Sequence, residues 1–141
     1  MTTLPVNRLD GSGLTRRIFV DDLNTAIIIR LFDLSSGTFD PLVDPTPPPL
    51  DISAQTALTM RFSKPGDEPG DAPVIVNKPA TFATITALPG FAGDGTDGYM
   101  EYKTESGFLD RSGRWRREGF VTIPAGSFAS EIIDFEVLDH L

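Results

Sequence analysis

Apolar and polar residues alternate in several short runs along the chain. In residues 56–63, TALTMRFS, apolar Leu58, Met60 and Phe62 are separated from one another by single polar residues. Successive side chains of a strand point to opposite faces of a sheet. The alternation therefore predicts a half-buried strand, with Phe62 as one of its core anchors.

Residues 24–33, NTAIIIRLFD, form an apolar run without such alternation. The run is rich in β-branched residues and is too short for a helix without capping residues. In a strand, Ile27 and Ile29 would share one face, while Ala26 and Ile28 would share the other. The run predicts a strand that is buried on both faces, with Ile28 as a second core anchor.

Turn-forming residues separate these runs from several others. The chain contains 13 Gly and 12 Pro, which imply many turns and little uninterrupted helix. Pro79 is expected to end a strand or to lie at a sheet edge, and PAGS predicts a hairpin between residues 113–123 and 130–138. Six to eight short strands at near-regular spacing predict an all-β sandwich. The further strand candidates are residues 16–20, 74–78, 81–86, 98–104, 113–123 and 130–138.

The chain length and the pattern at its N-terminus predict one domain preceded by an arm. A chain of 141 residues buries roughly 70% of its unfolded surface in a single core. Residues 1–15 contain scattered apolar residues and no sustained period, so we expect an extended N-terminal arm before a single domain, residues 16–141. Its apolar residues Leu4, Val6 and Leu9 are candidates for an interface.

The connection over residues 40–51, DPLVDPTPPPLD, is rich in proline. Consecutive prolines favour extended polyproline II geometry. The segment is either a ligand for a groove on a partner or a stiff surface connection, and the second interpretation is favoured because short proline-rich stretches are weak recognition signals. Its interface candidates are Pro45, Pro47, Pro48 and Pro49.

Composition argues against several classes of function. The chain has 12 Lys and Arg against 20 Asp and Glu, and this formal net charge of −8 repels a polyphosphate. There is no cysteine, and the one histidine is His140, so thiolate and histidine-based catalytic or metal sites have no ligands. No stretch approaches the roughly 20 apolar residues of a membrane span, and the N-terminus lacks a signal-peptide pattern. We therefore expect a non-enzymatic protein without cofactor or metal, and without nucleic-acid or membrane partners, although a pair of catalytic carboxylates leaves no local sequence signature.

Residues 92–99, AGDGTDGY, contain two aspartates among glycines. Asp94 and Asp97 could bind calcium, but an EF-hand loop needs a regular ligand series that ends in a distant glutamate. Here a strand begins directly at Tyr99. A turn that leads into that strand is the favoured interpretation.

The only tryptophan lies within residues 112–120, SGRWRREGF, among three arginines. Such a pattern can stack a base and hold phosphates. In a strand, however, Arg114 and Arg116 would share the face opposite to Trp115 and Arg117. We therefore expect Trp115 to be a core anchor, and Arg117 to be an inward-facing charge that needs a carboxylate or carbonyl partner if it is buried.

Five segments follow one another in the order FVDDLNTAIIIRLFD, LDISAQTALTMRFSKP, NKPATF, GTDGYMEYKT and LDRSGRWRREGFVTIPAGSFASEIIDFEV. The residues that carry their motifs are Asp97, Gly98 and Tyr102, then Gly113 and Trp115, then Ser130, Glu131, Phe135 and Val137. Over residues 16–138 this order resembles the immunoglobulin-like β-sandwich domain of bacteriophage tail and baseplate proteins, typified by the N-terminal domain of upper baseplate proteins. The chain departs from that pattern at Arg117, where the family usually has an apolar residue, and in the longer proline-rich connection.

The resemblance implies an immunoglobulin-like antiparallel sandwich of about seven to eight strands, with Phe135 in the core. It also implies a non-enzymatic virion structural protein, made in the host cytoplasm, which serves as a tail, baseplate or tail-fibre attachment (adaptor) subunit. Its partners would be other virion proteins and copies of itself. Two alternatives stay open: a capsid decoration protein, and a host-receptor or glycan-binding module in which Tyr99, Phe91 or Phe108 stacks on sugar rings.

Overall fold

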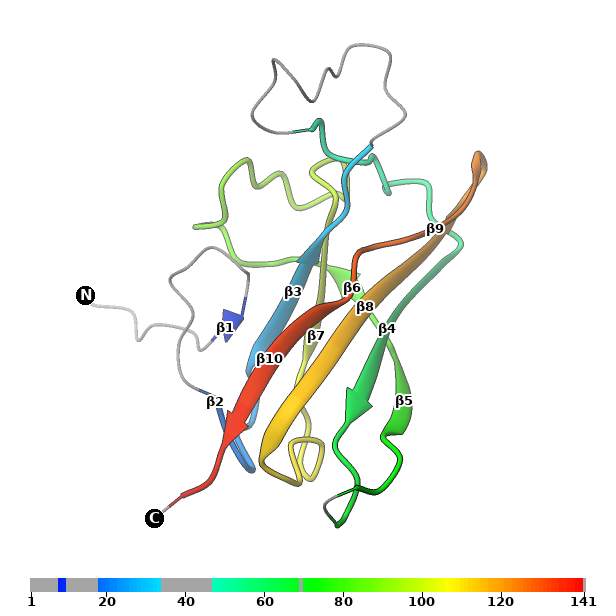
Figure 1. Ribbon diagram of the computed structural model, residues 1–141. Coiled ribbons are helices and arrows are strands. Elements are labelled where there is room, and N and C mark those ends of the chain that lie inside the picture. The colour runs from blue at the N-terminus through cyan, green and yellow to red at the C-terminus, as the bar shows by residue number, and fades with distance from the viewer. Residues whose placement is uncertain (1–7, 10–17, 34–46, 69, 141) are drawn as a thin grey trace, which may run out of the picture.

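The computed structural model describes residues 8–9, 18–33, 47–68 and 70–140 (Figure 1). Over these ranges the chain forms ten strands and no helix, so the prediction of an all-β fold is confirmed. Three strands have only two residues, and the other seven have four to eleven. In chain order they are β1 (Arg8–Leu9), β2 (Ile18–Phe19), β3 (Ala26–Arg30), β4 (Ala57–Lys64), β5 (Val74–Pro79), β6 (Thr81–Phe82), β7 (Tyr99–Lys103), β8 (Gly113–Ile123), β9 (Gly126–Ala129) and β10 (Ile133–Leu138).

The strands form two sheets that pack face to face, as Figure 1 shows. The four-stranded sheet has the order β1-β3-β7-β6, and the six-stranded sheet has the order β2-β10-β8-β4-β5 with β9 beside β8. The longer strands pair antiparallel as predicted, but β1 is parallel to β3 and β2 is parallel to β10. Parallel neighbours need a long connection, because a tight hairpin joins only antiparallel strands. Neither β1 nor β2 is joined to its neighbour by a hairpin, so parallel pairing is possible for both. The fold is β-sandwich-like, with two mixed sheets.

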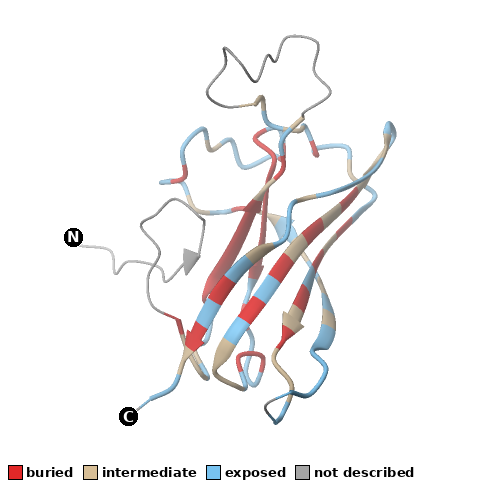
Figure 2. Cartoon of the chain, in the orientation of Figure 1, coloured by how far each residue is buried: buried red, intermediate tan, exposed pale blue. Residues whose placement is uncertain are grey.

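One apolar cluster fills the space between the sheets. Its largest members include Phe62 on β4, Trp115 on β8 and Phe135 on β10, and their exposed fractions are 0%, 0% and 6%. Figure 2 shows the alternation along β8 and β10 as bands of buried and exposed residues. Burying each such side chain stabilises the fold by about 1.5–3 kcal/mol.

Strand β3 is buried on both faces, as its sequence predicts. Ile27 and Ile29 belong to the cluster between the sheets, whereas Ala26 and Ile28 belong to a second cluster on the outer face of the four-stranded sheet. Each of these four side chains has an exposed fraction of 1% or less. A strand that must be covered twice needs a third layer, and the chain supplies one in residues 83–91.

Residues 83–91 cover the outer face of β3 and β7. Ala83 and Leu88 are buried there against Tyr99, whose hydroxyl donates a hydrogen bond to the carbonyl of Pro89 (2.6 Å). The guanidinium of Arg30 lies 4.5 Å from the ring centroid of Tyr99, and its Nε–H donates to the carbonyl of Asp97 (2.9 Å). The predicted strand over residues 81–86 is wrong beyond Phe82, because the segment after it covers the outer face of the four-stranded sheet.

The connection between β8 and β10 also differs from the prediction. PAGS was expected to join the two strands directly, but residues 126–129 form β9, which pairs with the C-terminal part of β8. Strand β10 pairs with the N-terminal part of β8. At the break between β9 and β10, the Ser130 N–H donates to the Gly119 carbonyl (2.8 Å), and the Gly119 N–H donates to Ser130 Oγ (2.8 Å). The long strand β8 is thus shared by two shorter partners.

The predicted edge strand over residues 16–20 is represented by β2, which pairs with β10 at one edge of the six-stranded sheet. The DDLN segment after it forms a tight turn. Asp21 and Asn24 have positive φ angles of 68° and 55°, which these two residue types tolerate better than most. The Asp22 carboxylate accepts a hydrogen bond from the Phe19 N–H (2.9 Å).

Within the predicted N-terminal arm, residues 1–15, the structure describes only Arg8 and Leu9. They form β1, with Arg8 opposite Ala26 and Leu9 opposite Ile27. This part of the segment therefore belongs to the four-stranded sheet of its own chain. The interface candidates Leu4 and Val6 lie outside the described residues.

Candidate functional site

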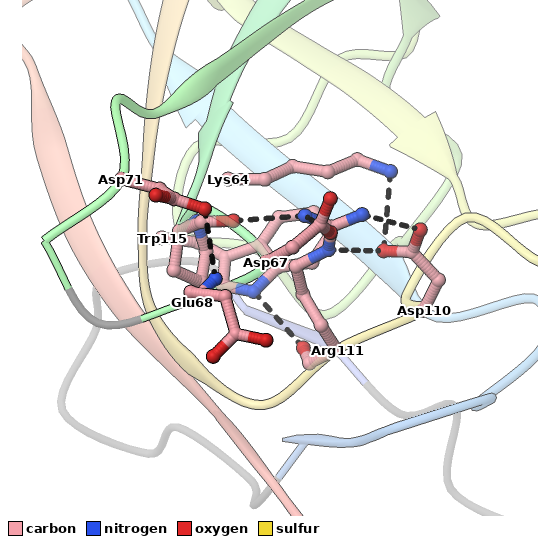
Figure 3. Close-up of polar contacts among 8 residues, drawn as sticks. Lys64, Asp67, Glu68, Asp71, Asp110, Arg111 and Trp115 are labelled. Carbon is pink, nitrogen blue, oxygen red and sulfur yellow. Dashed lines mark hydrogen bonds and ion pairs between the residues drawn. The ribbon is translucent and has the colours of Figure 1, made fainter.

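The two ends of the sandwich are built differently. We name them the closed end, where residues 104–112 and 65–73 connect the strands, and the open end, where residues 47–50 and 128–131 lie (Figure 1). Figure 3 shows the polar contacts of the closed end.

Trp115 lies inside the closed end and has no exposed surface. Its ring centroid is 5.6 Å from that of Phe108 and 5.9 Å from that of Phe135. Its Nε1–H donates to the carbonyl of Arg111 (3.2 Å; Figure 3), which supplies the polar partner that a buried indole needs. The tryptophan is a core residue and offers no face to a nucleic-acid base.

The loop between β7 and β8 inserts Phe108 and Leu109 between the sheets, where their exposed fractions are 4% and 0%. The Phe108 ring is 4.8 Å from Phe62 and 4.9 Å from Tyr102, in edge-to-face geometry. Such aromatic pairs contribute about 0.5–1.5 kcal/mol beyond their area burial. Phe108 therefore acts as a plug that closes this end of the sandwich.

Two of the three aromatics proposed for sugar stacking are buried. Phe108 and Tyr99 have exposed fractions of 4% and 5%, so the expectation that these two rings are exposed is wrong. Phe91 is half-buried against the cluster under residues 83–91. Each of these rings lies in or beside a loop segment that folds back onto a sheet, which sequence alternation does not reveal.

Lys64 is the last residue of β4 and points into the closed end, in phase with Phe62. Its Nζ lies 3.2 Å from Asp110 Oδ1, 5.3 Å from the ring of Trp115 and 5.5 Å from the ring of Phe108. An ammonium group over aromatic faces is stabilised by their quadrupoles. Lys64 thus links β4 to the loop that carries Phe108, through an ion pair with Asp110 and cation–π contacts with Phe108 and Trp115.

Arg111 extends this contact to the loop between β4 and β5. Its Nη1 lies 2.9 Å from Asp67 Oδ1 and donates to the Pro65 carbonyl (3.0 Å), and its Nη2 lies 3.2 Å from Asp110 Oδ2 (Figure 3). Burial raises the pKa of Asp110, but hydrogen bonds from Arg111 and Lys64 outweigh burial and hold that pKa below its ordinary value. We call Lys64, Asp110, Arg111 and Asp67 the charge clamp.

A second ion pair holds the start of the loop between β7 and β8. Lys78 Nζ lies 2.6 Å from Glu105 Oε1, which also accepts a hydrogen bond from the Tyr102 hydroxyl (2.8 Å). The Lys78 and Tyr102 hydrogen bonds lower the pKa of Glu105, while burial and the nearby Glu105 raise the pKa of Tyr102. These ion pairs fix loops, and each carboxylate is matched by a cation. The arrangement holds the loops of the closed end against the strands.

Arg117 is buried, with an exposed fraction of 1%. It lies on the same face of β8 as Trp115, opposite Phe62 on β4 and Ile133 on β10. Its Cζ is 5.6 Å from the ring centroid of Phe135. Arg117 therefore faces the interior of the sandwich, as predicted. No bulge interrupts β8 between Trp115 and Arg117.

Arg114 and Arg116 project from the opposite face of β8. Their side chains are 76% and 59% exposed, and both approach Asp134 on β10, at 3.9 Å and 3.3 Å. Exposed pairs of this kind contribute little to stability. The three arginines around Trp115 thus do not form one basic patch.

The open end contains a cleft of about 560 Å³ between the ends of the two sheets. Its walls come from the end of β3, from residues 47–50 and from the β9 segment. The apolar part of its lining includes Phe32, Pro47, Leu50 and Phe128, and the polar part includes Arg30 and Glu131. Pockets that bind ligands or partner side chains combine an apolar lining with a few polar groups in this way.

The described part of the proline-rich connection forms one wall of the cleft. Pro49 pairs with Phe32 in an isolated bridge, the Pro48 carbonyl accepts a hydrogen bond from the Asp33 N–H (2.8 Å), and the Leu50 N–H donates to the Leu31 carbonyl (2.9 Å). Pro47 to Pro49 are thus held against the end of β3. Pro45 lies outside the described residues.

A glycine makes this close approach possible. Gly98 has φ +77°, and a Cβ at this position would collide with the Leu31 carbonyl oxygen and lie 3.1 Å from the Leu50 carbonyl oxygen. Only glycine combines that backbone conformation with the absence of a side chain. The wall of the cleft therefore depends on Gly98.

Two large apolar side chains stand exposed at the cleft. Phe32 is 37% exposed and Phe128 is 40% exposed. Phe128 is opposite Val121 on β8 and has the inward phase, but it lies beyond the region that the other sheet covers. The sequence did not single out Phe128, because it lies between the turn expected at PAGS and the strand expected at residues 130–138.

Asp94 and Asp97 are used by their own turns. The Asp97 carboxylate accepts hydrogen bonds from the N–H groups of Ala92 (2.8 Å) and Tyr99 (3.0 Å), and Asp94 accepts one from Thr96 N–H (3.0 Å). The favoured interpretation, a turn that leads into a strand, agrees with this geometry. No cluster of three or more potential metal ligands occurs among the described residues.

No protein-family model matches the chain, and no curated protein matches it. The described segments contain no helix long and apolar enough to cross a membrane.

Proposed function

We propose that this protein is an interaction module that works by burying surface against other proteins, with the open-end cleft as its main contact. The observation that carries the proposal is the pair Phe32 and Phe128, two large, partly exposed apolar side chains that both line an apolar cleft. Aromatic residues in desolvated pockets dominate the energy of protein interfaces. Such a cleft suits an apolar anchor side chain from a partner.

The charged groups support the same function. At the closed end the clamp residues and the Lys78–Glu105 pair are occupied by one another, so they shape the scaffold. At the open end Arg30 is held by Asp97 and Tyr99, while Glu131 is exposed on the cleft rim. An apolar centre with a charged rim is the usual anatomy of a recognition patch.

The resemblance found in the sequence extends this proposal to a particular setting. An immunoglobulin-like sandwich of a bacteriophage tail would serve as a tail, baseplate or tail-fibre attachment subunit, and its partners would be other virion proteins and copies of itself. The two packed sheets, with long strands that pair antiparallel, support that setting. A capsid decoration protein with the same architecture would use the same cleft on a different partner.

The test compares incorporation of variants into phage particles. We expect Phe32→Ser and Phe128→Ser, combined, to lower the amount of the protein in purified particles at least about tenfold, because the partner loses its apolar contact. Leu23→Ser removes a more exposed apolar side chain, 58% exposed, from outside the cleft and should incorporate normally.

Quantitative mass spectrometry of purified particles, with separated tails and heads, gives the readout. Normal incorporation of the double variant would overturn the role of the cleft. Absence of the wild-type chain from particles would overturn the virion setting, and the interaction module would then be tested by whether the double variant loses partners that the Leu23→Ser variant keeps.

A further inference from the structure

Strand β5 forms an edge of the six-stranded sheet (Figure 1). It pairs with β4 on one side, and no described strand pairs with its other side. Val74 and Ile75 are 43% and 57% exposed, although both are large and apolar. An apolar edge strand is a template for pairing with another strand.

The register shows which backbone groups face the open side. The Ala80 N–H donates to the Leu58 carbonyl (3.0 Å), so Ala80 and Leu58 form a hydrogen-bonded pair of the β4–β5 ladder. The next pair, Thr59 and Pro79, is therefore a pair without hydrogen bonds. Hydrogen-bonded pairs alternate along an antiparallel ladder. Ile75 and Asn77 therefore direct their N–H and C=O groups away from β4, toward the open edge.

Prolines limit that edge at both ends. Pro73 and Pro79 have the same phase as Ile75 and Asn77, so each presents a carbonyl to the open side but has no N–H to donate. The donors of the edge are thus confined to Ile75 and Asn77. Prolines at both ends of an edge strand prevent extended pairing with other strands. They still allow a partner strand to pair with the few residues between them.

We propose that this edge pairs antiparallel with β5 of a second copy, across a two-fold axis at Ile75. The sequence Val74–Ile75–Val76 is apolar and symmetric about its centre. In this register Ile75 faces Ile75 of the second copy, and Val74 faces Val76. The Ile75 groups exchange hydrogen bonds with each other, and the Asn77 N–H reaches the Pro73 carbonyl of the second copy.

The hydrogen-bonding groups of the edge favour a second copy as the occupant. In the two-fold register the two edge donors, the N–H groups of Ile75 and Asn77, each meet a carbonyl of the second copy, and Pro73, which has no N–H, lies opposite Asn77. Lys78 stays paired with Glu105 of its own chain. The net charge of −8 opposes association at long range, but screening limits that repulsion to about 8 Å at physiological salt.

The pairing is closed, because each copy uses the same edge once and the product is a two-fold dimer. It supplies the contact between copies that the proposed function includes, and it rests on that proposal only for its biological setting. The edge shares no residue with the lining of the open-end cleft. The two surfaces can therefore be tested separately.

The first experiment measures the mass of the purified full chain over a range of concentrations, by sedimentation velocity and light scattering. We expect the wild-type chain to form dimers, and Ile75→Lys to weaken association at least about tenfold, since a charge at the pairing centre meets its own copy. Ile132→Lys is the matched control, because Ile132 is 60% exposed and lies outside β5. It should dimerise like the wild type.

Ile75→Pro provides a backbone test. It removes an N–H that faces the open edge, so the β4–β5 hydrogen bonds and the circular dichroism spectrum should be preserved while dimers are lost. Ile75→Cys, in a chain without other cysteines, should give a disulfide-linked dimer on mild oxidation, whereas Ile132→Cys should not. A monomeric wild type, or dimers that survive both Ile75 substitutions, would overturn the proposal. Loss of particle incorporation in the cleft variants with dimers intact would leave it standing.

Discussion

The closed end and the open end show two ways to finish the same sandwich. At the closed end, a loop inserts Phe108 beside Trp115, and ion pairs from β4 and β5 hold the loop in place. At the open end, the proline-rich wall and the β9 segment lie apart, and Phe32 and Phe128 remain exposed. The same kinds of residue are buried at one end and remain partly exposed at the other.

The difference shows why residue type alone does not identify a binding site. Trp115 with its arginine neighbours has the composition of a recognition patch, yet the indole is completely buried. Phe128 lies in a plain Ser-Phe-Ala segment, yet it lines the cleft. What distinguishes them is whether the opposite sheet extends far enough to cover the inward face of the strand.

The largest expected effect is at the closed end. Trp115→Ala should lower the free energy of unfolding by about 3–5 kcal/mol, because it leaves a cavity between Phe108 and Phe135 and removes two aromatic contacts. Urea denaturation followed by circular dichroism measures the change. A loss below that of the open-end variant Phe128→Ala would contradict the contrast between the ends.

A smaller effect is expected from the charge clamp. Lys64→Met keeps the apolar stem but removes the ammonium group that contacts Asp110, Phe108 and Trp115. We expect a loss of about 1–2 kcal/mol in the free energy of unfolding. Lys103→Met, at an exposed position of β7, is the control and should change stability little. Equal losses in the two variants would show that the clamp does not stabilise the fold.

The clamp also predicts an acid dependence. The pKa of Asp110 is lower in the folded chain than its ordinary value, so its contribution to stability is complete above the ordinary carboxyl pKa, near 4, and is lost as the pH falls through the lower folded value. Thermal melts between about pH 7 and pH 2.5 should therefore show a shallower decline for Asp110→Asn than for the wild type. Lys64→Met should make the decline shallower too; an unchanged acid slope in both variants would disprove the coupling.

The smallest effect on stability is expected at the open end. Phe128→Ser changes a side chain that is already 40% exposed, so the free energy of unfolding should fall by less than about 1 kcal/mol. Thermal and urea unfolding should both detect this small change. A loss as large as that of Trp115→Ala would mean that Phe128 belongs to the core and that the cleft is not free for a partner.

Local sequence predicted the parts of the fold that depend on strand phase. The alternation in β4, the double burial of β3 and the inward phase of Trp115 and Arg117 all follow from a two-residue period. The composition in Gly and Pro also predicted little uninterrupted helix, and the described residues contain none.

The candidate site could not be predicted in the same way. Lys64 and Asp110 are 46 residues apart in sequence, and Lys78 and Glu105 are 27 apart, so no local pattern connects them. The cleft depends on where one sheet stops relative to the other. Of the interface candidates, Pro47 lies in its lining, while Phe32 and Phe128 were found only from the structure.

The parallel pairing of β2 with β10 has a mechanical consequence. These neighbouring strands are the first and last of the six-stranded sheet along the chain, with Ile18 beside Val137 and Phe19 beside Leu138. Tension applied from the N-terminal side of β2 and the C-terminal side of β10 would pull the two strands past each other along their length. In that shear geometry the hydrogen bonds between them, and those between β10 and β8, resist the force together rather than opening one at a time.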